Sequence, residues 1–333
     1  MNAPQVIHLT VDEEAVGQRL DNFLFRHLKG VPKTHVYRIV RSGEVRINKG
    51  RVGAEHKLAL GDVIRIPPVR VSAEADRVAS THAPAREFPL LFEDESFLAV
   101  HKPAGVAVHG GSGVSSGVIE QLRQARPQAR YLELVHRLDR ETSGVLLIAK
   151  KRSALRQLQD QFRERSTGKT YLTLVKGGWP VNRKVLDQPL HKYLLPDGER
   201  RVKVVSVEHP DGMRSITLVR LVAQVPDPAA AAPVGEGVCS LLEVTIKTGR
   251  THQIRVHLSH AGHAIAGDDK YGDFEWNRGL IRSGHKRMFL HAWRLELSHP
   301  VTQQQMELRA PLPQELLAML PNGLSEGLWL QAS

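Results

Sequence analysis

The feature that most constrains the fold is a polar loop of nine residues set between two apolar segments. The loop spans 136–144, with the sequence His-Arg-Leu-Asp-Arg-Glu-Thr-Ser-Gly, and the apolar run 145–149 follows it directly. An apolar run of this kind, flanked by polar residues, predicts a strand that is buried on both faces. Since a shorter apolar segment at 132–135 precedes the loop, we expect a turn between two strands, in which Gly144 lets the backbone return to the sheet.

This turn places one carboxylate, that of Asp139, between the two arginines Arg137 and Arg140. A positive charge within about 4–6 Å favours the ionised form of a carboxylate. Asp139 is therefore predicted to stay charged, which suits a nucleophile or an anchor and does not suit a proton donor. The spacing leaves a second interpretation open, an ordinary polar turn whose aspartate accepts hydrogen bonds from nearby backbone N–H groups.

Composition indicates a globular protein with a polyanionic partner. The chain has 333 residues, of which 41% are hydrophobic, enough for one large domain and a smaller one. Lys and Arg exceed Asp and Glu by 46 to 35, and nucleic acid is the commonest partner for such an excess. The single cysteine, Cys239, excludes an internal disulfide framework and a zinc site built from several cysteines. No signal-peptide pattern opens the chain, and no apolar run approaches about 18 residues, so we expect a cytoplasmic protein.

Much of the positive charge lies in the segment 17–70, where twelve Lys and Arg accompany four Asp and Glu. The pattern predicts two short helices followed by strands near 45–52 and 61–66. This segment resembles the S4 RNA-binding module, and its charge is typical of a surface that binds a phosphate backbone. A solvated basic surface without a partner is the alternative. The cationic side chains expected to contact RNA are Arg19, Lys33, Arg38, Arg41, Arg46 and Arg51.

Small and polar residues dominate 71–87, which predicts a linker between an S4-like domain at 17–70 and a second domain at 88–320. In the second domain, many strand patterns with few helices between them predict an α+β fold with a mixed, largely antiparallel sheet. An Ala- and Pro-rich segment at 225–238 predicts a surface insertion. The predicted strands are 90–92, 97–100, 169–175, 201–207, 215–222, 241–247 and 289–295, and the predicted helices are 118–126, 153–162 and one near 316–317.

The second stretch of chemical interest is 249–258, with the sequence Gly-Arg-Thr-His-Gln-Ile-Arg-Val-His-Leu. Thr251 is predicted to cap a helix whose residues Ile254 and Leu258 face the core. Arg255 then points to a different face of this helix. A lone arginine so close to a buried apolar stripe requires an anion as its partner.

The sequence disfavours two other chemistries, metal binding and serine hydrolysis. His252, His257, His260 and His263 suggest a metal site, but their spacing splays them and no Asp, Glu or Cys lies among them. The segment 113–117 fits Gly-x-Ser-x-Gly, yet a Gly- and Ser-rich loop precedes it where a nucleophile elbow needs a core strand. The sequence also lacks a phosphate-binding loop and a dinucleotide fingerprint.

Several motifs, in order along nearly the whole chain, resemble those of the RluA-type pseudouridine synthases. The loop 136–144 resembles the signature of this family. The further matching segments are 101–105, 169–171, 249–258, 262–268 and 290–293. The resemblance implies an isomerase that detaches uracil from its ribose and rejoins it through carbon, with no cofactor and no metal. The implied substrate is 23S ribosomal RNA of the large subunit, and the implied state is a monomer.

The resemblance also implies a role for each site residue. Asp139 is expected to be the nucleophile, on ribose C1′ or on the uracil ring, and Arg255 to ion-pair with it. Tyr171 and Ile254 are expected to pack on the base, with the Tyr171 phenol taking part in proton removal. Arg137 is expected to enter the space left when the uridine flips out of its stack. A non-catalytic ribosome-assembly factor and a base-releasing glycosidase are the competing hypotheses.

Overall fold

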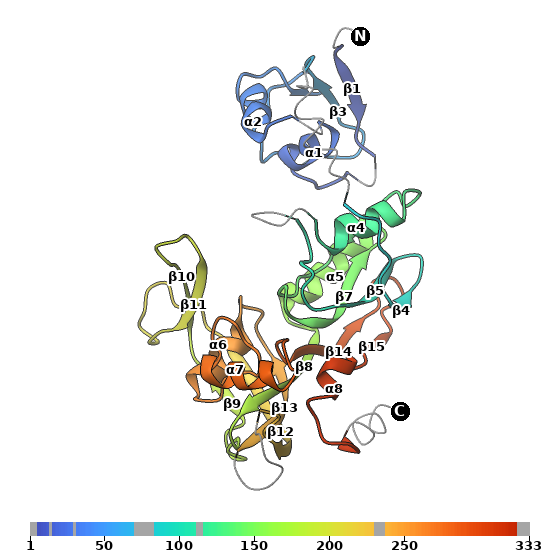
Figure 1. Ribbon diagram of the computed structural model, residues 1–333. Coiled ribbons are helices and arrows are strands. Elements are labelled where there is room, and N and C mark those ends of the chain that lie inside the picture. Colours follow the sequence, from blue (N-terminus) through green and yellow to red (C-terminus); the bar gives the residue numbers. More distant parts are fainter. Residues whose placement is uncertain are drawn as a thin grey trace. The chain divides into compact units, whose positions relative to one another are not determined.

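A computed structural model describes residues 5–12, 15–28, 31–69, 83–110, 116–229 and 237–324. The chain divides into two compact units (Figure 1). The first comprises Met1–Ala85 with Lys151–Ser153, and the second comprises Arg86–Lys150 with Ala154–Ser333. Most of the predicted linker, and residues 230–236 of the Ala- and Pro-rich segment, lie outside the described residues. The predicted domain boundaries therefore stay predictions.

The first unit is a three-stranded antiparallel sheet with two helices, and it contains both predicted helices. Its sheet has the order β1-β3-β2. Its elements are β1 (Ile7–Thr10), α1 (Leu20–His27), α2 (Lys33–Arg41), β2 (Arg46–Ile47) and β3 (Val63–Ile66). The strand expected over 45–52 is only two residues long, because Asn48 and Lys49 adopt left-handed backbone conformations and turn the chain.

Helical periodicity builds the core of the first unit. Leu20 and Leu24 of α1 are buried, as are Val36 and Ile39 of α2, and all four belong to one apolar cluster with the strand residue Ile64. Each helix thus buries one stripe and leaves its arginines on the outer side.

Ten strands of the second unit form one mixed sheet with the order β4-β5-β7-β14-β8-β13-β12-β9, in which β6 also pairs with β7 and β15 with β14. The pairing of β14 with β7 is parallel and the other pairings are antiparallel. The strands are β4 (Leu90–Glu93), β5 (Phe97–Lys102), β6 (Glu133–Leu134), β7 (Ser143–Ala149), β8 (Gly168–Lys176), β9 (Val185–Asp187), β12 (Ile216–Pro226), β13 (Val238–Ile246), β14 (Leu290–Ser298) and β15 (Gln305–Arg309). A separate hairpin consists of β10 (Leu190–Leu194) and β11 (Arg200–Val204).

The helices of the second unit complete an α+β fold, as predicted. They are α4 (Val118–Ala125), α5 (Arg152–Glu164), α6 (Gln253–His260), α7 (Phe274–Arg282) and α8 (Gln314–Leu317). The sequence analysis missed α7, although Asp273 is a strong start signal that accepts hydrogen bonds from the backbone of Glu275 and Trp276. None of the helices in the described part of the chain is long and apolar enough to cross a membrane.

The predicted buried strand is β7, and all seven of its residues are buried. Val145 and Leu147 belong to one apolar cluster, and Leu146 and Ile148 belong to another. Both faces of the strand are therefore covered, which explains why its sequence is continuously apolar and does not alternate.

One row of paired residues crosses the middle of the sheet from β5 to β13. Lys102 of β5 pairs with Gly144 of β7, Gly144 with Ala292 of β14, Ala292 with Tyr171 of β8, and Tyr171 with Val244 of β13. The polar loop 136–144 thus ends beside the strand that carries Tyr171.

We predict that Gly144→Ala lowers the free energy of unfolding by about 3 kcal/mol or more. Gly144 has a φ of +120°, and an added Cβ would overlap the backbone oxygen and nitrogen of Ala292. Gly198→Ala is the matched control, because Gly198 also has a positive φ, of +83°, but open space around it, and should cost only about 1 kcal/mol. Denaturant unfolding of both variants measures the difference. Equal losses would show that the close approach of β7 to β14 is unimportant.

Candidate active site

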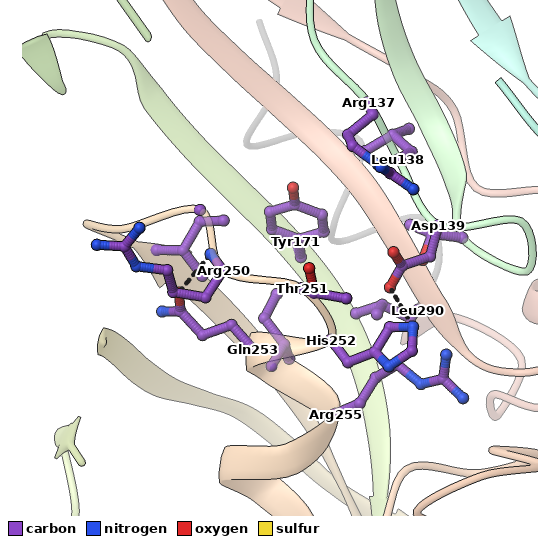
Figure 2. A pocket seen from close by; sticks show the side chains of 14 residues that line it. Arg137, Leu138, Asp139, Tyr171, Arg250, Thr251, His252, Gln253, Arg255 and Leu290 are labelled. Carbon is purple, nitrogen blue, oxygen red and sulfur yellow. Dashed lines mark hydrogen bonds and ion pairs between the residues drawn. The ribbon is translucent and has the colours of Figure 1, made fainter. Parts of the chain in front are cut away.

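The site residues predicted from the sequence line one pocket of about 120 Å³ (Figure 2). Asp139 comes from the loop between β6 and β7, Tyr171 from β8, and Arg255 from the first turn of α6. Arg137 and Ile254 line the same pocket. The structure therefore brings together five side chains from three distant stretches of sequence, and their chemical roles stay predictions.

The backbone of the Asp139 loop is fixed by a neighbouring loop. The carbonyl of Arg140 accepts hydrogen bonds from the Gly105 N–H (2.9 Å) and from Nζ of Lys102 (3.0 Å). Lys102 is fully buried, and its Nζ also donates to the carbonyls of Pro103 (2.8 Å) and Val106 (2.7 Å). Burial lowers the pKa of Lys102 to about 7. One buried amine thus ties the turn after β5 to the turn that carries Asp139.

The Asp139 side chain is partly exposed in the pocket, and its carboxylate lies near a histidine. Oδ2 of Asp139 lies 3.9 Å from Nε2 of His252. Arg140 turns away, since its Nε donates to the Gly105 carbonyl (3.0 Å). Among the described residues, neither Arg140 nor Arg137 lies within 4.0 Å of the Asp139 carboxylate, so neither flanking arginine forms a direct ion pair with it.

The expected ion pair between Arg255 and Asp139 is also wrong in this structure. Arg255 is buried and pairs with the fully buried Asp268, through Nε to Oδ2 (2.7 Å) and Nη2 to Oδ1 (2.5 Å). Its Nη2 also contacts Asp269 (3.0 Å). Burial opposes the charge on Arg255, but the bonds to Asp268 prevail and raise the pKa of its guanidinium. The physical reason for the difference is that a buried carboxylate needs a counter-charge more than the partly exposed Asp139 does.

Tyr171 and Ile254 form the apolar side of the pocket. Tyr171 is half-buried and packs against two apolar clusters, one with Leu138 and Ala292 and one with Ile254. Burial, and then the nearby Asp139 charge, raise the pKa of the Tyr171 phenol. The phenol therefore keeps its proton.

The sequence analysis missed His252, which it considered only as a metal ligand. His252, and not Thr251, is the N-cap residue of α6, with a left-handed backbone (φ +53°, ψ +20°). Its Nδ1 lies 2.8 Å from the Tyr271 hydroxyl. The signal that was available is its place between Thr251 and Gln253, inside the motif that also supplies Ile254 and Arg255.

Within the described ranges, the group of side chains with metal-ligand spacing includes none of the four histidines that the sequence suggested. His191, His209 and Asp211 have ligand atoms within 4.8 Å of one another, near the β10–β11 hairpin. A backbone N–H, that of Asp211, donates to Nδ1 of His209 (3.2 Å), so one of these ring nitrogens already has a partner.

In the first unit, two of the predicted RNA contacts lie together. Arg41 and Arg51 line a hollow of about 430 Å³ that also includes Tyr37. Neither arginine has an ion pair among the described residues. Both are free to bind an anion.

The other four predicted RNA contacts have partners within the first unit. Arg19 pairs with the buried Asp21 (2.7 Å) and contacts Glu55 (3.3 Å), so it supports the start of α1. The remaining contacts are Arg38 to Glu44 (3.7 Å), Arg46 to the Gly43 carbonyl (3.3 Å), and Lys33 over the Phe25 ring (5.4 Å).

Comparison with known proteins gives the family. A model of RNA pseudouridylate synthases matches residues 96–260, and an S4 domain model matches residues 18–64. Ribosomal large subunit pseudouridine synthase C of Yersinia pestis is 50% identical over 323 residues, which cover 95% of this chain and 95% of that protein. The chain belongs to the RluA-type RNA pseudouridine synthases.

Other matches agree with this assignment. The synthase C of Escherichia coli (strain K12) is 49% identical over 317 residues, covering 94% of each chain. A solved structure, human RNA pseudouridylate synthase domain containing 1, shares the fold with a TM-score of 0.57 and 24% identity, over 75% of this chain and 98% of that one. The predicted family, the S4 module and the enzyme class, an isomerase, are thereby confirmed.

We predict that Lys102→Met lowers the free energy of unfolding by about 2–4 kcal/mol, because three carbonyl groups each lose a hydrogen bond from this buried amine. Lys184→Met is the control, since Lys184 is exposed, and its change should stay within about 0.5 kcal/mol. Thermal and denaturant unfolding measure both. A Lys102→Met protein as stable as the control would show that Nζ does not support the Asp139 loop.

Proposed function

We propose that the chain converts specific uridines of 23S ribosomal RNA into pseudouridine, with Asp139 as the nucleophile and the target uridine flipped out of its stack. The single observation that carries the proposal is the pocket that gathers Asp139, Tyr171 and Arg255 in a member of this family. Relatives that cover nearly the whole chain are named for the ribosomal large subunit, which supports ribosomal RNA as the substrate.

Asp139 suits nucleophilic attack because its carboxylate is accessible while the backbone of its loop is fixed by hydrogen bonds. Its side chain is 24% exposed, while its loop is bonded to the turn after β5. A covalent step from this carboxylate divides one difficult displacement into two easier steps. Attack on ribose C1′ and attack on the uracil ring are both compatible with this position.

Tyr171 and Ile254 are proposed to pack on the uracil, and Arg137 to enter the space that the flipped base leaves. The raised pKa of Tyr171 favours a packing surface and hydrogen-bond donor over a phenolate base. Arg137 is exposed at the pocket rim, from which a flexible guanidinium can reach the RNA stack.

A basic groove of about 440 Å³ continues from this pocket, sharing Arg137, Tyr171 and Arg250 with it. Arg165 and Lys169 also line the groove and have no ion pair within the described part of the chain. Burial, and then the positive charges of Arg165 and Lys247, lower the pKa of Lys169. Cations crowded in this way favour an anion between them, as the backbone of an RNA strand would supply.

The remaining assignments belong to the same proposal. The S4-like domain at 17–70 selects where the enzyme binds on folded ribosomal RNA, and the catalytic domain at 88–320 acts on the uridine, with the linker 71–87 between them. The enzyme works as a cytoplasmic monomer without cofactor or metal, since a carboxylate nucleophile and an isomerisation need neither.

We predict that Asp139→Asn lowers pseudouridine formation by a factor on the order of 1,000 or more, because an amide of the same shape is not a nucleophile. Binding to the RNA should stay within about twofold of the wild type. Pseudouridine is measured by mass spectrometry of digested 23S transcripts, and Asp197→Asn, in an exposed turn, is the control. Substantial activity in Asp139→Asn would remove Asp139 from the mechanism.

The same assay separates the competing hypotheses. Free uracil that accumulates with time would identify a glycosidase. A wild-type protein that makes no pseudouridine, together with equal rescue of a null strain by Asp139→Asn, would identify a non-catalytic assembly factor.

We predict that the basic groove beside the pocket and the Arg41–Arg51 hollow of the first unit bind different parts of the RNA. Arg165→Gln with Lys169→Gln should weaken binding to both a short single strand and folded 23S RNA, and reduce the salt dependence of binding by about one to two counterions. Arg41→Gln with Arg51→Gln should weaken binding to folded RNA alone. Salt titrations of binding measure both pairs, with the exposed Arg278→Gln as the control. Equal effects on both RNAs would contradict the separate role of the S4-like domain.

A further inference from the structure

We propose that His252 is a positioning residue that holds the Asp139 carboxylate for attack, through an Nε2–H bond whose direction is set by Tyr271. This inference deepens the proposed function and rests on it. It makes an imidazole the group that orients the carboxylate, in place of the ion pair with Arg255 that the family resemblance implied.

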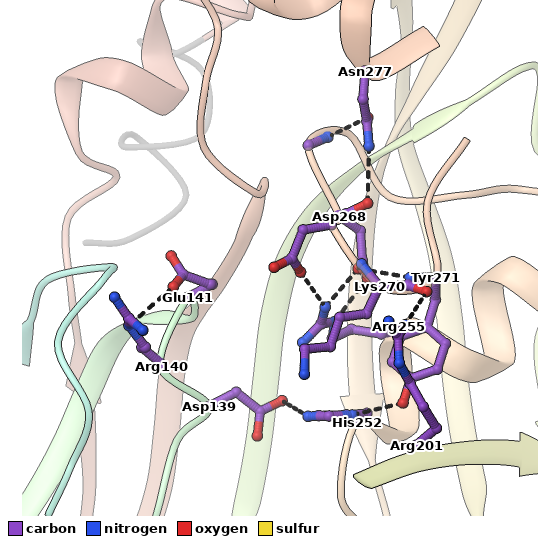
Figure 3. A network of polar contacts seen from close by, with 12 residues as sticks. Asp139, Arg140, Glu141, Arg201, His252, Arg255, Asp268, Lys270, Tyr271 and Asn277 are labelled. Atoms are coloured by element: carbon purple, nitrogen blue, oxygen red, sulfur yellow. Dashed lines mark hydrogen bonds and ion pairs between the residues drawn. The ribbon is translucent and has the colours of Figure 1, made fainter. Parts of the chain in front are cut away.

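A chain of polar contacts leads from the β10–β11 hairpin to the Asp139 loop (Figure 3). The backbone N–H of Val202 donates to the Tyr271 hydroxyl oxygen (3.0 Å). That hydroxyl lies 2.8 Å from Nδ1 of His252. The other ring nitrogen, Nε2, lies 3.9 Å from Oδ2 of Asp139.

Burial determines the protonation state of both side chains in this contact. Burial raises the pKa of Tyr271 to about 12, so its phenol keeps its proton. Burial also lowers the pKa of His252, although the Asp139 charge acts in the opposite direction, so the ring is neutral at pH 7. A neutral imidazole has one N–H. In the proposed arrangement the phenol donates to Nδ1, so that N–H is on Nε2 and faces Asp139.

The other charged groups near His252 are already paired. Arg255 and Lys270 disfavour a positive charge on the ring, and Asp268 favours it. Arg255 is held by Asp268, and Lys270 by Glu199. In Figures 2 and 3, Asp139 is drawn with a single dashed contact, and it leads to His252.

The backbone supports a functional role for this histidine. His252 has a φ of +53°, a left-handed conformation that costs free energy for a side chain with a Cβ. Histidine and asparagine occupy this region more often than most residues. Such conformations persist where the surrounding structure holds them, and they concentrate at active sites.

At 3.9 Å the contact is longer than a hydrogen bond. Hydrogen bonds of a catalytic site are commonly long in the free enzyme and tighten when substrate binds. When a uridine fills the pocket, the Nε2–H bond to Oδ2 shortens. It then fixes the orientation of the carboxylate and leaves the other oxygen, Oδ1, free to attack.

The kinetic test uses His252→Asn, because asparagine suits the left-handed backbone and can contact Tyr271 but is too short to reach Asp139. We expect kcat to fall by about 10- to 100-fold, as for a misplaced reacting group, while KM changes less than about twofold. His260→Asn, an exposed position at the end of α6, is the matched control and should keep wild-type kinetics. Wild-type kcat in His252→Asn, or a loss confined to KM, would overturn the proposal.

A double-mutant cycle tests the link to Tyr271. Tyr271→Phe should lower kcat by about 3- to 10-fold, and adding it to His252→Asn should cause little further loss, because the phenol acts through the imidazole. Additive losses would show that Tyr271 acts on the reaction independently of His252.

A third measurement needs no activity, so it separates this inference from the proposed function. Nitrogen-15 NMR of the histidine rings, with the His252 signal assigned from the His252→Asn spectrum, should show a neutral ring with its proton on Nε2 at pH 7. In Tyr271→Phe the other tautomer should become populated. A protonated ring, or a proton on Nδ1 in the wild type, would overturn the inference even in a protein fully active on 23S RNA.

Discussion

The buried pair of Arg255 and Asp268 is the interaction on which the site depends. It joins the first turn of α6 to the turn that follows Asp268, and the same carboxylate accepts the backbone N–H groups of Lys270 and Tyr271. Removing one partner of such a pair leaves a buried charge and costs about 3–5 kcal/mol. Tyr271 and the α6 cap residue His252 keep their contact only while this pair holds both segments in place.

Two buried basic side chains near Asp139, those of Lys102 and Arg255, thus stabilise the structure around the site. Lys102 binds three carbonyls below the Asp139 loop, and Arg255 binds Asp268 beside it. Neither pairs with Asp139 within the described part of the chain. A carboxylate locked in a two-point pair with a guanidinium is a weak nucleophile because both oxygens are occupied. The structure instead leaves one oxygen of Asp139 in contact with a histidine and the other in the pocket.

The sequence predicted the elements whose patterns are local. The continuously apolar run before Ala149 predicted the buried strand β7, and the amphipathic periods predicted α1, α2 and α5. It also predicted that Arg255 needs an anion, and the family resemblance implied that this anion is Asp139. The choice between Asp139 and Asp268 depends on burial, which spacing does not report. His252 was missed for a related reason, since its two ring nitrogens meet partners 19 residues downstream and in a loop far upstream. The sheet order, including the parallel pairing of β7 with β14, is likewise a long-range property.

The proposed neutral state of His252 would allow the pocket to orient Asp139 and keep its carboxylate reactive. A guanidinium would stabilise the carboxylate charge and lower its nucleophilicity together, whereas a neutral N–H donor fixes direction with less stabilisation of the charge. The burial that keeps His252 uncharged also keeps Tyr271 protonated, so both conditions for the Nε2–H tautomer come from the same packing. In the proposed mechanism, the orientation of the Asp139 carboxylate therefore follows from the apolar packing and the backbone N–H of Val202 as much as from any charge in the pocket.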